Sequence, residues 1–394
     1  MNATTTVILG GGFGGIAAAN TLRSLAPRDH DIIVVDQTAD FLVGAGKTWM
    51  MLGERTYPQI SRARADLLEP GVRFLQAGVS SIDLTGRTVA AGDATLHWDH
   101  LVIALGADFA PGTVPGLAES ARTFYTPTGA SALHAVLERF AGGEIVMLLP
   151  KLPIKCPPAP YEAIMLLHDY FQRRGLADKV RLSLHTVEGA PMQTAGPEMG
   201  QFIKGELAQR GIAYHPLRKT VGVDGATRRV IFEDGAAAAY DLLIAIPPHV
   251  APQVVRDANL TGPGGWIQVD PLTLEVTSAA NATDVYAIGD VMAMTLPGRF
   301  KPDVPLSLPK AGVLAAEQAG VVARRIAAKL QGLAAGDVFG GRGFCYLELG
   351  AGRAVRAEGA FFELPHPVMQ KRVPDEAQWR DKLDWVELQL KPRR

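Results

Sequence analysis

The sequence predicts an α/β protein made of two Rossmann-like domains and a small C-terminal region. Three observations support this fold class. Short runs of β-branched and apolar residues alternate with helical patterns through most of the chain, as in parallel sheets flanked by helices. A glycine-rich turn follows the first of these runs. Two later apolar runs end in turns of small residues, where the chain is expected to return to the first domain.

The first domain is expected to be discontinuous, with the second domain inserted into it. Residues 1–111 and 247–330 form the two parts of the first domain, and residues 112–246 form the second. Residues 331–394 form the C-terminal region, which ends in an amphipathic helix.

Composition sets limits on the function. Of the 394 residues, 47% are hydrophobic and 20% are charged, which is ordinary for a protein with a large core. The net charge of −1, without a block of basic residues, argues against a nucleic-acid partner. Apolar runs such as Leu101–Ala104 and Leu242–Ile246 are too short to cross a bilayer, and no secretory signal is recognised. We expect a cytoplasmic protein or one bound peripherally to a membrane. Two cysteines are too few for a zinc site, so no metal is expected.

A dinucleotide-binding pattern opens the chain. Thr6–Leu9 is predicted to be a strand, Ile16–Leu25 a helix and Asp31–Val35 a second strand that ends in Asp36. The turn between the first strand and the helix reads Gly10-Gly11-Gly12-Phe13-Gly14-Gly15. Its first, third and sixth residues match G-x-G-x-x-G, where glycines let the backbone approach a pyrophosphate and the acid binds a ribose. The alternative is a tight glycine turn without a ligand.

Two later segments indicate that the dinucleotide is FAD. Residues 99–107 and 283–290 are apolar strands followed by small residues. They resemble the two further FAD-binding segments of flavoprotein reductases that contain two dinucleotide-binding domains. The residues expected at the cofactor are Ala104, Gly106, Gly289 and Asp290. In that family Asp290 would hold the ribitol or pyrophosphate side, whereas the alternative role for this aspartate is a helix N-cap.

The loop Phe41–Met50 would run towards the flavin ring in the same family. It contains no cysteine, so we expect the FAD to be bound non-covalently. Lys47 in this loop would favour an anionic reduced flavin. The alternative is a solvated lysine without a role.

The second domain lacks a phosphate-binding loop. Its predicted strands and helices are Glu144–Leu149, Tyr161–Arg174, Val180–Thr186, Gly200–Gln209, Val230–Phe232 and Leu242–Ile246, with the strands in one sheet. This is the position of the NAD(P)H domain in the reductases. However, Pro150–Cys156 contains no glycine after the first strand. Proline has no N–H donor and cannot adopt a positive φ, so nicotinamide binding is not expected.

The same loop carries one of the two cysteines. Cys156 stands between prolines, and Cys345 follows 189 positions later. Two buried, inert thiols are the alternative, because free cysteine is commonly buried. The proline-rich setting and the missing glycine loop favour a chemical role instead. The helix that begins near Tyr161 is expected to lower the pKa of Cys156.

A family resemblance becomes specific at this point. The segment reads Lys155-Cys156-Pro157-Pro158-Ala159-Pro160-Tyr161-Glu162. It resembles the signature of the sulfide-oxidising flavoproteins, which are sulfide:quinone oxidoreductase and the flavoprotein subunit of flavocytochrome c sulfide dehydrogenase. The segment around Cys345 resembles their second redox cysteine. Leu306–Gly312 resembles their helix entry beneath the flavin pyrimidine. The resemblance extends over essentially the whole chain.

The sequence departs from that family in three ways. The third cysteine of many quinone-linked members is missing, which argues against long polysulfide chains. A cysteine for a covalent flavin and an export signal, usual in the flavocytochrome subunit, are also missing. The C-terminal docking part is short and consists of the predicted helix Pro374–Leu390. Its apolar stripe of Trp379, Leu383, Val386 and Leu390 is interpreted as a core or homodimer face, with membrane docking as the alternative.

The resemblance implies that Cys156 and Cys345 form a redox pair that passes electrons from sulfide, or a related small sulfur nucleophile, to FAD. Glu162 is the candidate acid–base residue, or alternatively a partner of the helix dipole. Lys310, before the predicted helix Ala311–Gln331, would stabilise negative charge on the reduced ring, unless it is a surface lysine.

Quinone is the expected electron acceptor. Phe361, Phe362 and Pro365–Val368 are the candidates to line its pocket, although aromatic pairs are usually core residues. Three alternatives remain open at this point. They are a sulfide dehydrogenase that reduces a cytochrome c, an NADH:quinone-type reductase, and a non-catalytic FAD-binding interaction protein.

Overall fold

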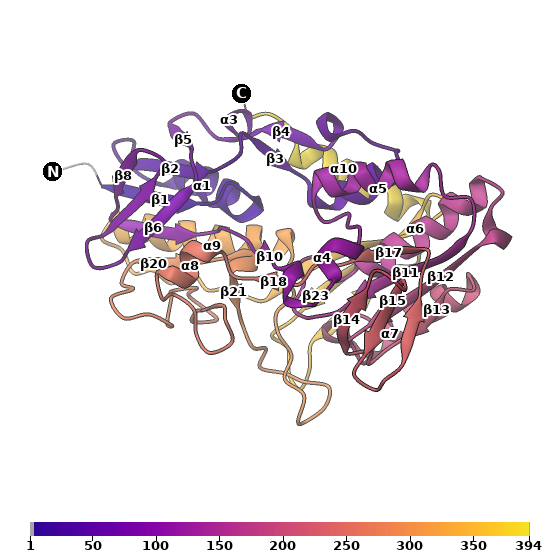
Figure 1. Cartoon of the computed structure of the whole chain (residues 1–394). Coiled ribbons are helices and arrows are strands. Elements are labelled where there is room, and N and C mark those ends of the chain that lie inside the picture. The colour runs from indigo at the N-terminus through magenta and orange to yellow at the C-terminus, as the bar shows by residue number, and fades with distance from the viewer. Residues whose placement is uncertain (1–3, 394) are drawn as a thin grey trace.

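A computed structural model describes residues 4–393. Figure 1 shows two α/β units side by side, each built on a parallel sheet. The first sheet consists, in spatial order, of β20 (Val285–Ala287), β9 (His100–Ile103), β1 (Thr5–Leu9), β2 (Asp31–Asp36) and β5 (Val72–Gln76). Chain segments from before and after the second sheet therefore build the first one.

The first sheet is buried because its strands consist almost wholly of β-branched and aliphatic residues. Helices α1 (Phe13–Leu25) and α9 (Gly312–Leu330) pack against each other beside it. The antiparallel strands β6 (Val79–Asp83), β7 (Thr88–Ala91) and β8 (Ala94–His97) contribute Ile82 and Val89 to the same core. The strand order reverses at β1, since β2 lies on one side of it and β9 on the other. Ligands of open α/β sheets bind at such a switch point, beyond the carboxyl ends of the strands.

The second sheet is also parallel. Its strands, in spatial order, are β13 (Ala213–His215), β12 (Val180–Thr186), β11 (Gly143–Leu149) and β17 (Leu242–Ala245). The carboxyl end of β11 leads into the proline-rich loop and then into helix α6 (Ala159–Arg173). The carboxyl end of β12 leads through Glu188 towards helix α7 (Gly196–Gln209).

One predicted strand belongs elsewhere. The expectation that Val230–Phe232 continues the second sheet is wrong. The strand β15 (Arg229–Phe232) lies between β14 (Thr220–Asp224) and β16 (Ala237–Ala239) in a separate antiparallel sheet. The physical reason is the short connections. A parallel partner needs a crossover of about a dozen residues or more, whereas the turns on both sides of β15 are hairpin turns.

The C-terminal region packs against the second unit. It forms an antiparallel sheet of β22 (Arg342–Gly350), β23 (Arg353–Ala360) and β24 (Val368–Lys371), followed by helix α10 (Glu376–Gln389). Val386 and Leu390 of the predicted stripe are buried in the core that also contains α6. Leu383 is partly buried against the same core, and Trp379 is half-buried outside it, so the C-terminal half of the stripe is a core face. No helix in the described part of the chain is long and apolar enough to cross a membrane.

The remaining elements are short or link the two units. The other helices are α2 (Lys47–Met51), α3 (Arg64–Leu67), α4 (Leu117–Ser120), α5 (Pro127–Leu137) and α8 (Gln253–Asp257). The two-stranded pairs are β3 (Asp40–Leu42) with β4 (Ser61–Ala63), β10 (Asp108–Phe109) with β18 (His249–Val250), and β19 (Ile267–Gln268) with β21 (Met292–Ala293). The predicted α/β fold class is confirmed by the two parallel sheets and their helices.

The glycine turn after β1 gives a first testable prediction. A Cβ added at Gly15 would lie 1.8 Å from the carbonyl oxygen of Gly10, whereas one added at Gly12 would meet no atom within 4 Å. We expect Gly15→Ala to lower the free energy of unfolding by about 1–3 kcal/mol, because a rigid backbone atom must move. Gly12→Ala is the matched control, with an expected change within about 0.5 kcal/mol. Urea unfolding of both apoproteins measures the difference, and equal stability of the two variants would contradict the packing argument.

Candidate functional site

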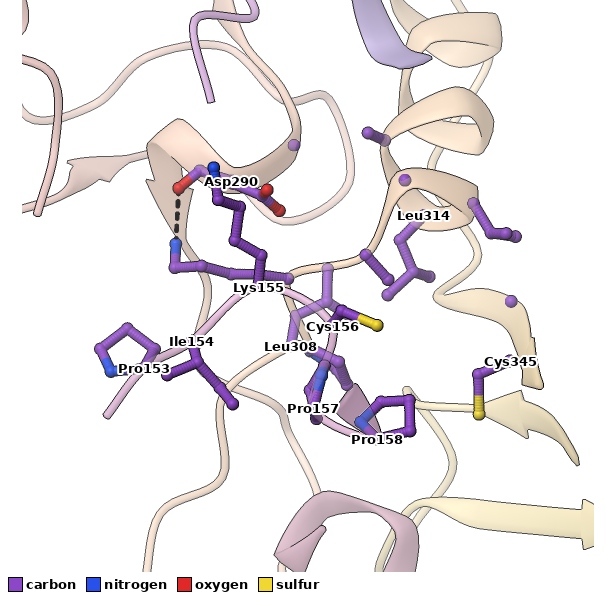
Figure 2. A pocket seen from close by; sticks show the side chains of 18 of the residues that line it. Pro153, Ile154, Lys155, Cys156, Pro157, Pro158, Asp290, Leu308, Leu314 and Cys345 are labelled. Atoms are coloured by element: carbon purple, nitrogen blue, oxygen red, sulfur yellow. Dashed lines mark hydrogen bonds between the residues drawn. The ribbon is translucent and has the colours of Figure 1, made fainter. Parts of the chain in front are cut away.

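A single large cavity lies where the carboxyl ends of the two parallel sheets meet. Its volume is about 870 Å³, within the usual size range of cofactor sites. The first unit contributes the turns after β1, β9 and β20, and the second unit contributes the loop after β11 and the segment after β12. Strand β22 and helix α10 close the cavity from the C-terminal region. Figure 2 shows Asp290, Cys156 and Cys345 around this space.

The glycine turn after β1 contributes Gly12, Phe13 and Gly14 to the cavity wall. Gly10 and Gly15 lie outside the wall. An added Cβ at Gly10 would be 2.3 Å from the Ala104 carbonyl oxygen, so the two outer glycines let the strands and helix approach each other. Phe13 begins α1, whose N-terminal N–H groups therefore face the same turn.

Asp36 ends strand β2 and lies outside the cavity wall. Its carboxylate accepts the Gly11 N–H at 2.8 Å and pairs with the Arg64 guanidinium at 3.2 Å. Arg64 also donates to the Gly11 carbonyl at 2.7 Å. Arg64 could not be predicted, because an isolated arginine on a short helix carries no sequence pattern. The arrangement fixes the acid beside the glycine turn.

Two further turns bring small residues to the wall. Ala104 and Gly106 follow β9, and Gly289 and Asp290 follow β20. The Asp290 Oδ1 atom is buried without a hydrogen-bond partner among the described residues. The residues 289–291 form a 3-10 turn whose N-cap is Ile288, so Asp290 is not the N-cap that the alternative required. A buried acceptor beside backbone turns fits the hydroxyl-rich chain of a flavin nucleotide.

Lys310 is 5% exposed, so the surface-lysine alternative is wrong. Its ammonium donates to the carbonyl oxygens of Asp290 and Met292, both at 2.7 Å, and lies 3.7 Å from the centre of the Trp266 ring. Burial lowers the pKa of Lys310 to about 8, although the nearby Asp290 raises it. The charge is therefore held by backbone carbonyls directly before α9.

Two other lysines contact the cavity. Lys47 is half-buried at the start of α2 and donates to the Tyr125 carbonyl at 2.7 Å, so it is not the solvated loop lysine of the alternative. Burial lowers the pKa of Lys47 to about 8. Lys155 donates to the Ala107 carbonyl at 3.1 Å and lies 4.5 Å from the centre of the Phe109 ring. The cavity thus has a wall of positive charge that suits an anionic ligand.

Cys156 has an unusual backbone conformation. Its φ is +56°, in the left-handed region that non-glycine residues rarely occupy. Its N–H donates to the Lys310 carbonyl at 2.8 Å, and its own carbonyl accepts the Ala159 N–H at 2.9 Å. The loop is also held by the Tyr125 hydroxyl, which donates to the Lys155 carbonyl at 2.9 Å. Strain of this kind persists where surrounding bonds over-determine the backbone, often at functional sites.

The two cysteines line the same cavity and come from distant parts of the chain. Cys345 is half-buried in the middle of β22, and both residues are free thiols. In Figure 2 the Cys156 sulfur points towards the side of the cavity on which Cys345 lies. The Cys156 thiol is open to the cavity, but the cavity lies within the protein. Burial raises the pKa of each thiol to about 12.

The expectation that the pKa of Cys156 is lowered is therefore wrong in its net direction. Burial is the largest effect, and the carboxylate of Glu162 adds to it, while Lys382, Lys47 and the backbone N–H of Ala159 oppose both. Helix α6 begins at Ala159 instead of Tyr161, so its first N–H does lower the pKa, but this does not compensate for the loss of water around the sulfur.

Glu162 lies in a buried ionic cluster that the sequence did not reveal. The Lys382 ammonium is 3.0 Å from Glu162 and 2.5 Å from Glu348. The Glu348 N–H donates to Glu162 at 2.9 Å, and the Trp49 indole donates to Glu348 at 2.8 Å. One lysine thus faces two carboxylates, and burial raises the pKa of Glu162. Glu162 is therefore more than a partner of the helix dipole, which was the alternative role for this residue.

An aromatic group forms the side of the cavity near α10. The Phe13 and Trp385 rings stack with centroids 5.8 Å apart, and Phe344 packs edge-on against Trp385 at 6.3 Å. Of the residues predicted for an acceptor pocket, Phe361 lines the cavity, whereas Phe362 packs on Phe339 outside the lining. The Pro365–Val368 segment is likewise outside the lining.

The predicted site residues are therefore brought together to different degrees. The cavity wall contains Gly12, Phe13, Gly14, Lys47, Ala104, Gly106, Cys156, Glu162, Gly289, Asp290, Lys310 and Cys345. Gly10, Gly15 and Asp36 stand behind it and shape the turn. The side chains that sequence reasoning missed are Lys382, Trp385 and Glu188, which a single sequence places only once the fold is known.

Two family models match the chain. Residues 4–147 match the pyridine nucleotide-disulphide oxidoreductase model, and residues 130–247 match the central part of the flavoprotein chain of sulfide dehydrogenase [flavocytochrome c]. The second match covers the proline-rich loop and both strand ends that face the cavity.

Similar proteins agree with these matches. The mitochondrial sulfide:quinone oxidoreductase of Mus musculus is 23% identical over 89% of this chain and 77% of that protein. The mitochondrial sulfide:quinone oxidoreductase of Dictyostelium discoideum is 23% identical over 73% of this chain, and the match spans 65% of its own length. The crystal structure of sulfide:quinone oxidoreductase from Aquifex aeolicus superimposes with a TM-score of 0.83 at 21% identity, over 98% of this chain and 90% of that one.

The shared fold and the matched models agree with the cavity. Residues 4–247 are similar to the pyridine nucleotide-disulphide oxidoreductases and to the flavoprotein chain of sulfide dehydrogenase [flavocytochrome c], and the chain as a whole has the fold of sulfide:quinone oxidoreductase.

Proposed function

We propose that this oxidoreductase binds FAD non-covalently, oxidises sulfide or a related small sulfur nucleophile through Cys156 and Cys345, and passes the electrons to a quinone. One observation carries the proposal. The only two cysteines of the chain, 189 positions apart in sequence, line one cavity with the residues suited to a flavin. Two inert thiols would not require the left-handed backbone of Cys156.

The sulfur step is a thiol–disulfide exchange. Hydrosulfide attacks one sulfur of an oxidised Cys156–Cys345 pair, the S–S bond breaks, and its electron pair leaves on the other sulfur. One cysteine then carries a persulfide and the other is a thiolate. A second hydrosulfide or another small thiolate then takes the outer sulfur of the persulfide, which leaves both cysteines reduced. When their S–S bond re-forms, two electrons and two protons are released. Bound FAD supplies the acceptor for these two electrons.

The rate of this exchange depends on the protonation of the sulfur that leaves. A thiol with a pKa of about 12 is a poor leaving group as a thiolate, so a nearby acid favours the exchange. Glu162 is the proposed donor, because its pKa is raised and it lines the cavity with both cysteines. Lys310 and Lys47 are proposed to stabilise negative charge on the reduced flavin ring.

The cofactor-binding part of the proposal rests on the three turns of the first unit. Gly12, Gly14 and Gly106 would allow close approach of the nucleotide, and Asp290 would accept hydrogen bonds through its unpartnered oxygen. Asp36 beside Gly11 is proposed to face the ribose. Residues 1–111 and 247–330 would form this FAD domain around the inserted 112–246 domain.

Quinone is proposed as the acceptor because the aromatic group of Phe13, Phe344 and Trp385 gives the cavity an apolar side next to α10. Because quinones dissolve in the lipid of membranes, the protein is proposed to act at a membrane surface. NADH is not proposed as the donor, because the loop after β11 offers prolines and a strained cysteine where glycine N–H groups would hold a pyrophosphate.

The proposed function is tested by an anaerobic titration of the FAD-loaded enzyme. We expect stoichiometric sulfide to bleach the flavin absorbance and NADH to leave it unchanged. A quinone added afterwards should restore the absorbance faster than cytochrome c does. Bleaching by NADH would assign the chain to the NADH:quinone reductases, and bleaching by neither donor would favour a non-catalytic flavoprotein.

The thiol role predicts a separable phenotype. We expect Cys156→Ser to retain its FAD and its folded stability, since an oxygen replaces a sulfur at an open position of the cavity. Sulfide-driven reduction should fall by at least about 10³-fold, because the exchange loses one of its two sulfurs. Stopped-flow absorbance under anaerobic conditions measures the rate. Dithionite should still reduce the variant, and a wild-type rate with sulfide would remove Cys156 from the mechanism.

The ionic cluster around Glu162 predicts a pH-dependent stability. Lys382→Met leaves Glu162 and Glu348 buried without a cation, which should cost about 3–5 kcal/mol at pH 8. Lys382 lowers the pKa of Glu162, so its loss raises the folded-state pKa of Glu162 further. Protons then favour the folded state, so the deficit should shrink as the pH falls to 5. Urea unfolding at both pH values measures it, with the exposed Lys391→Met as control. A deficit that is equal at both pH values would contradict a charge-based role.

A further inference from the structure

Glu188 is a buried carboxyl on the cavity wall that the chemistry above does not use. It stands two residues after β12, is 6% exposed, and lines the cavity together with the following residues Met192–Ala195. The Tyr161 hydroxyl donates to its Oε2 atom at 2.5 Å, and the Thr186 hydroxyl lies 3.5 Å from the same atom. The Met192 backbone N–H also hydrogen-bonds the carboxyl.

The position of Glu188 corresponds to that of Asp36 in the first unit. Both acids follow the second strand of a Rossmann-like unit, where a dinucleotide fold places its ribose carboxylate. Asp36 accepts an N–H from its glycine turn. Glu188 has no such turn and instead accepts from Tyr161, on the helix that follows the Cys156 loop. An acid thus lies at this place in a unit whose first loop presents a thiol to the cavity.

Glu188 also differs from Glu162 in its charge partners. Glu162 pairs with Lys382, whereas no lysine or arginine lies within ion-pair distance of Glu188 in the described part of the chain. The titratable side chains that face it are Tyr161 from α6 and Tyr214 from β13. The pKa of Tyr161 lies well above its ordinary value and that of Tyr214 is raised to about 12, so both stay neutral near pH 7.

A buried carboxyl without a cation gains and loses a proton near neutrality. Burial raises the pKa of Glu188 to about 7, against the hydrogen bonds from Tyr161, Thr186 and the Met192 backbone, which lower it. General bases work best when their pKa lies near the working pH. The group therefore combines a place on the cavity wall, beside the Cys156 loop, with a matched proton affinity.

We propose that Glu188 is the base that takes a proton from incoming hydrogen sulfide before the sulfur attacks the cysteine pair. In this step the S–H bond of H₂S breaks, its proton moves to the Glu188 carboxylate, and the electron pair stays on the sulfur of hydrosulfide. Hydrosulfide then enters the exchange with Cys156 and Cys345. Electrons leave through the pair to bound FAD and a quinone, so no further oxidant is needed. The inference rests on the proposed function and adds the residue that prepares its substrate.

Sulfide-driven flavin reduction in Glu188→Gln tests the proposal. The FAD-loaded variant should be reduced by sulfide about 10²–10⁴-fold more slowly at pH 7, the usual contribution of a general base. Glu188→Asp should recover part of the rate. Reoxidation by quinone should stay within twofold of the wild type, because that half-reaction does not use hydrogen sulfide. Glu198→Gln, an exposed position on α7 of the same unit, is the matched control and should be unchanged.

An infrared titration gives a readout that a structural role would not move. The wild-type holoenzyme should show a carboxylic-acid C=O band that disappears with a midpoint near pH 7, and this band should be absent from Glu188→Gln. Tyr161→Phe should move the midpoint upward and slow sulfide-driven reduction, because the lost hydrogen bond stabilises the ionised acid. This second variant keeps the proposal testable if Glu188→Gln does not fold.

The outcomes separate the two proposals. If sulfide does not bleach the wild-type flavin, the proposed function fails. If sulfide bleaches the wild type and Cys156→Ser abolishes this, but Glu188→Gln is reduced within twofold of the wild-type rate, the role of Glu188 is overturned while the function stands. Equal slowing of sulfide-driven reduction and quinone-driven reoxidation in Glu188→Gln would also overturn it, because a general defect would then explain the loss.

Discussion

The site depends on the hydrogen bond from the Cys156 N–H to the Lys310 carbonyl, at 2.8 Å. Cys156 belongs to the loop after β11, and Lys310 directly precedes α9 of the first unit, so this bond joins the two units at the cavity. It also fixes a cysteine in the left-handed region, which an unconstrained chain would leave. The same lysine holds Asp290 and Met292 through its ammonium. One residue therefore aligns the thiol loop with the turn suited to the flavin.

The electrostatics of the cavity follow from burial on all sides. Lys47 and Lys310 have lowered pKa values, and the thiols and Glu162 have raised ones, since each charged form loses water. Lys382 is the exception, because two carboxylates raise its pKa. The cluster of Lys382, Glu162 and Glu348 ties α10 and β22 to α6. Removing one partner from such a cluster lowers the free energy of unfolding strongly, although the complete cluster need not stabilise the fold.

Much of this architecture could be predicted from the sequence, because the relevant signals are local. The glycine turn, the apolar strands and the proline-rich cysteine loop each lie within about ten residues and gave the fold class and most wall residues. Contacts between distant segments could not be predicted. Lys382 is a single lysine in a helix, and nothing near it indicates that it meets Glu162, 220 positions away. The raised pKa of Cys156 could not be predicted for the same reason, since burial depends on segments that are remote in the sequence.

The two buried glutamates of the cavity show how the second unit differs from a nicotinamide domain. A nicotinamide needs N–H donors for its pyrophosphate and an acid for its ribose, and this unit has kept only the acid. Without a sugar to bind, a buried carboxylate would be unfavourable unless other groups satisfied it. Tyr161 meets that need for Glu188 from α6, the helix that also carries Glu162 to Lys382. Helix α6, which begins three residues after Cys156, therefore supplies a contact to each acid: it carries Glu162 itself, and it carries the Tyr161 that donates to Glu188.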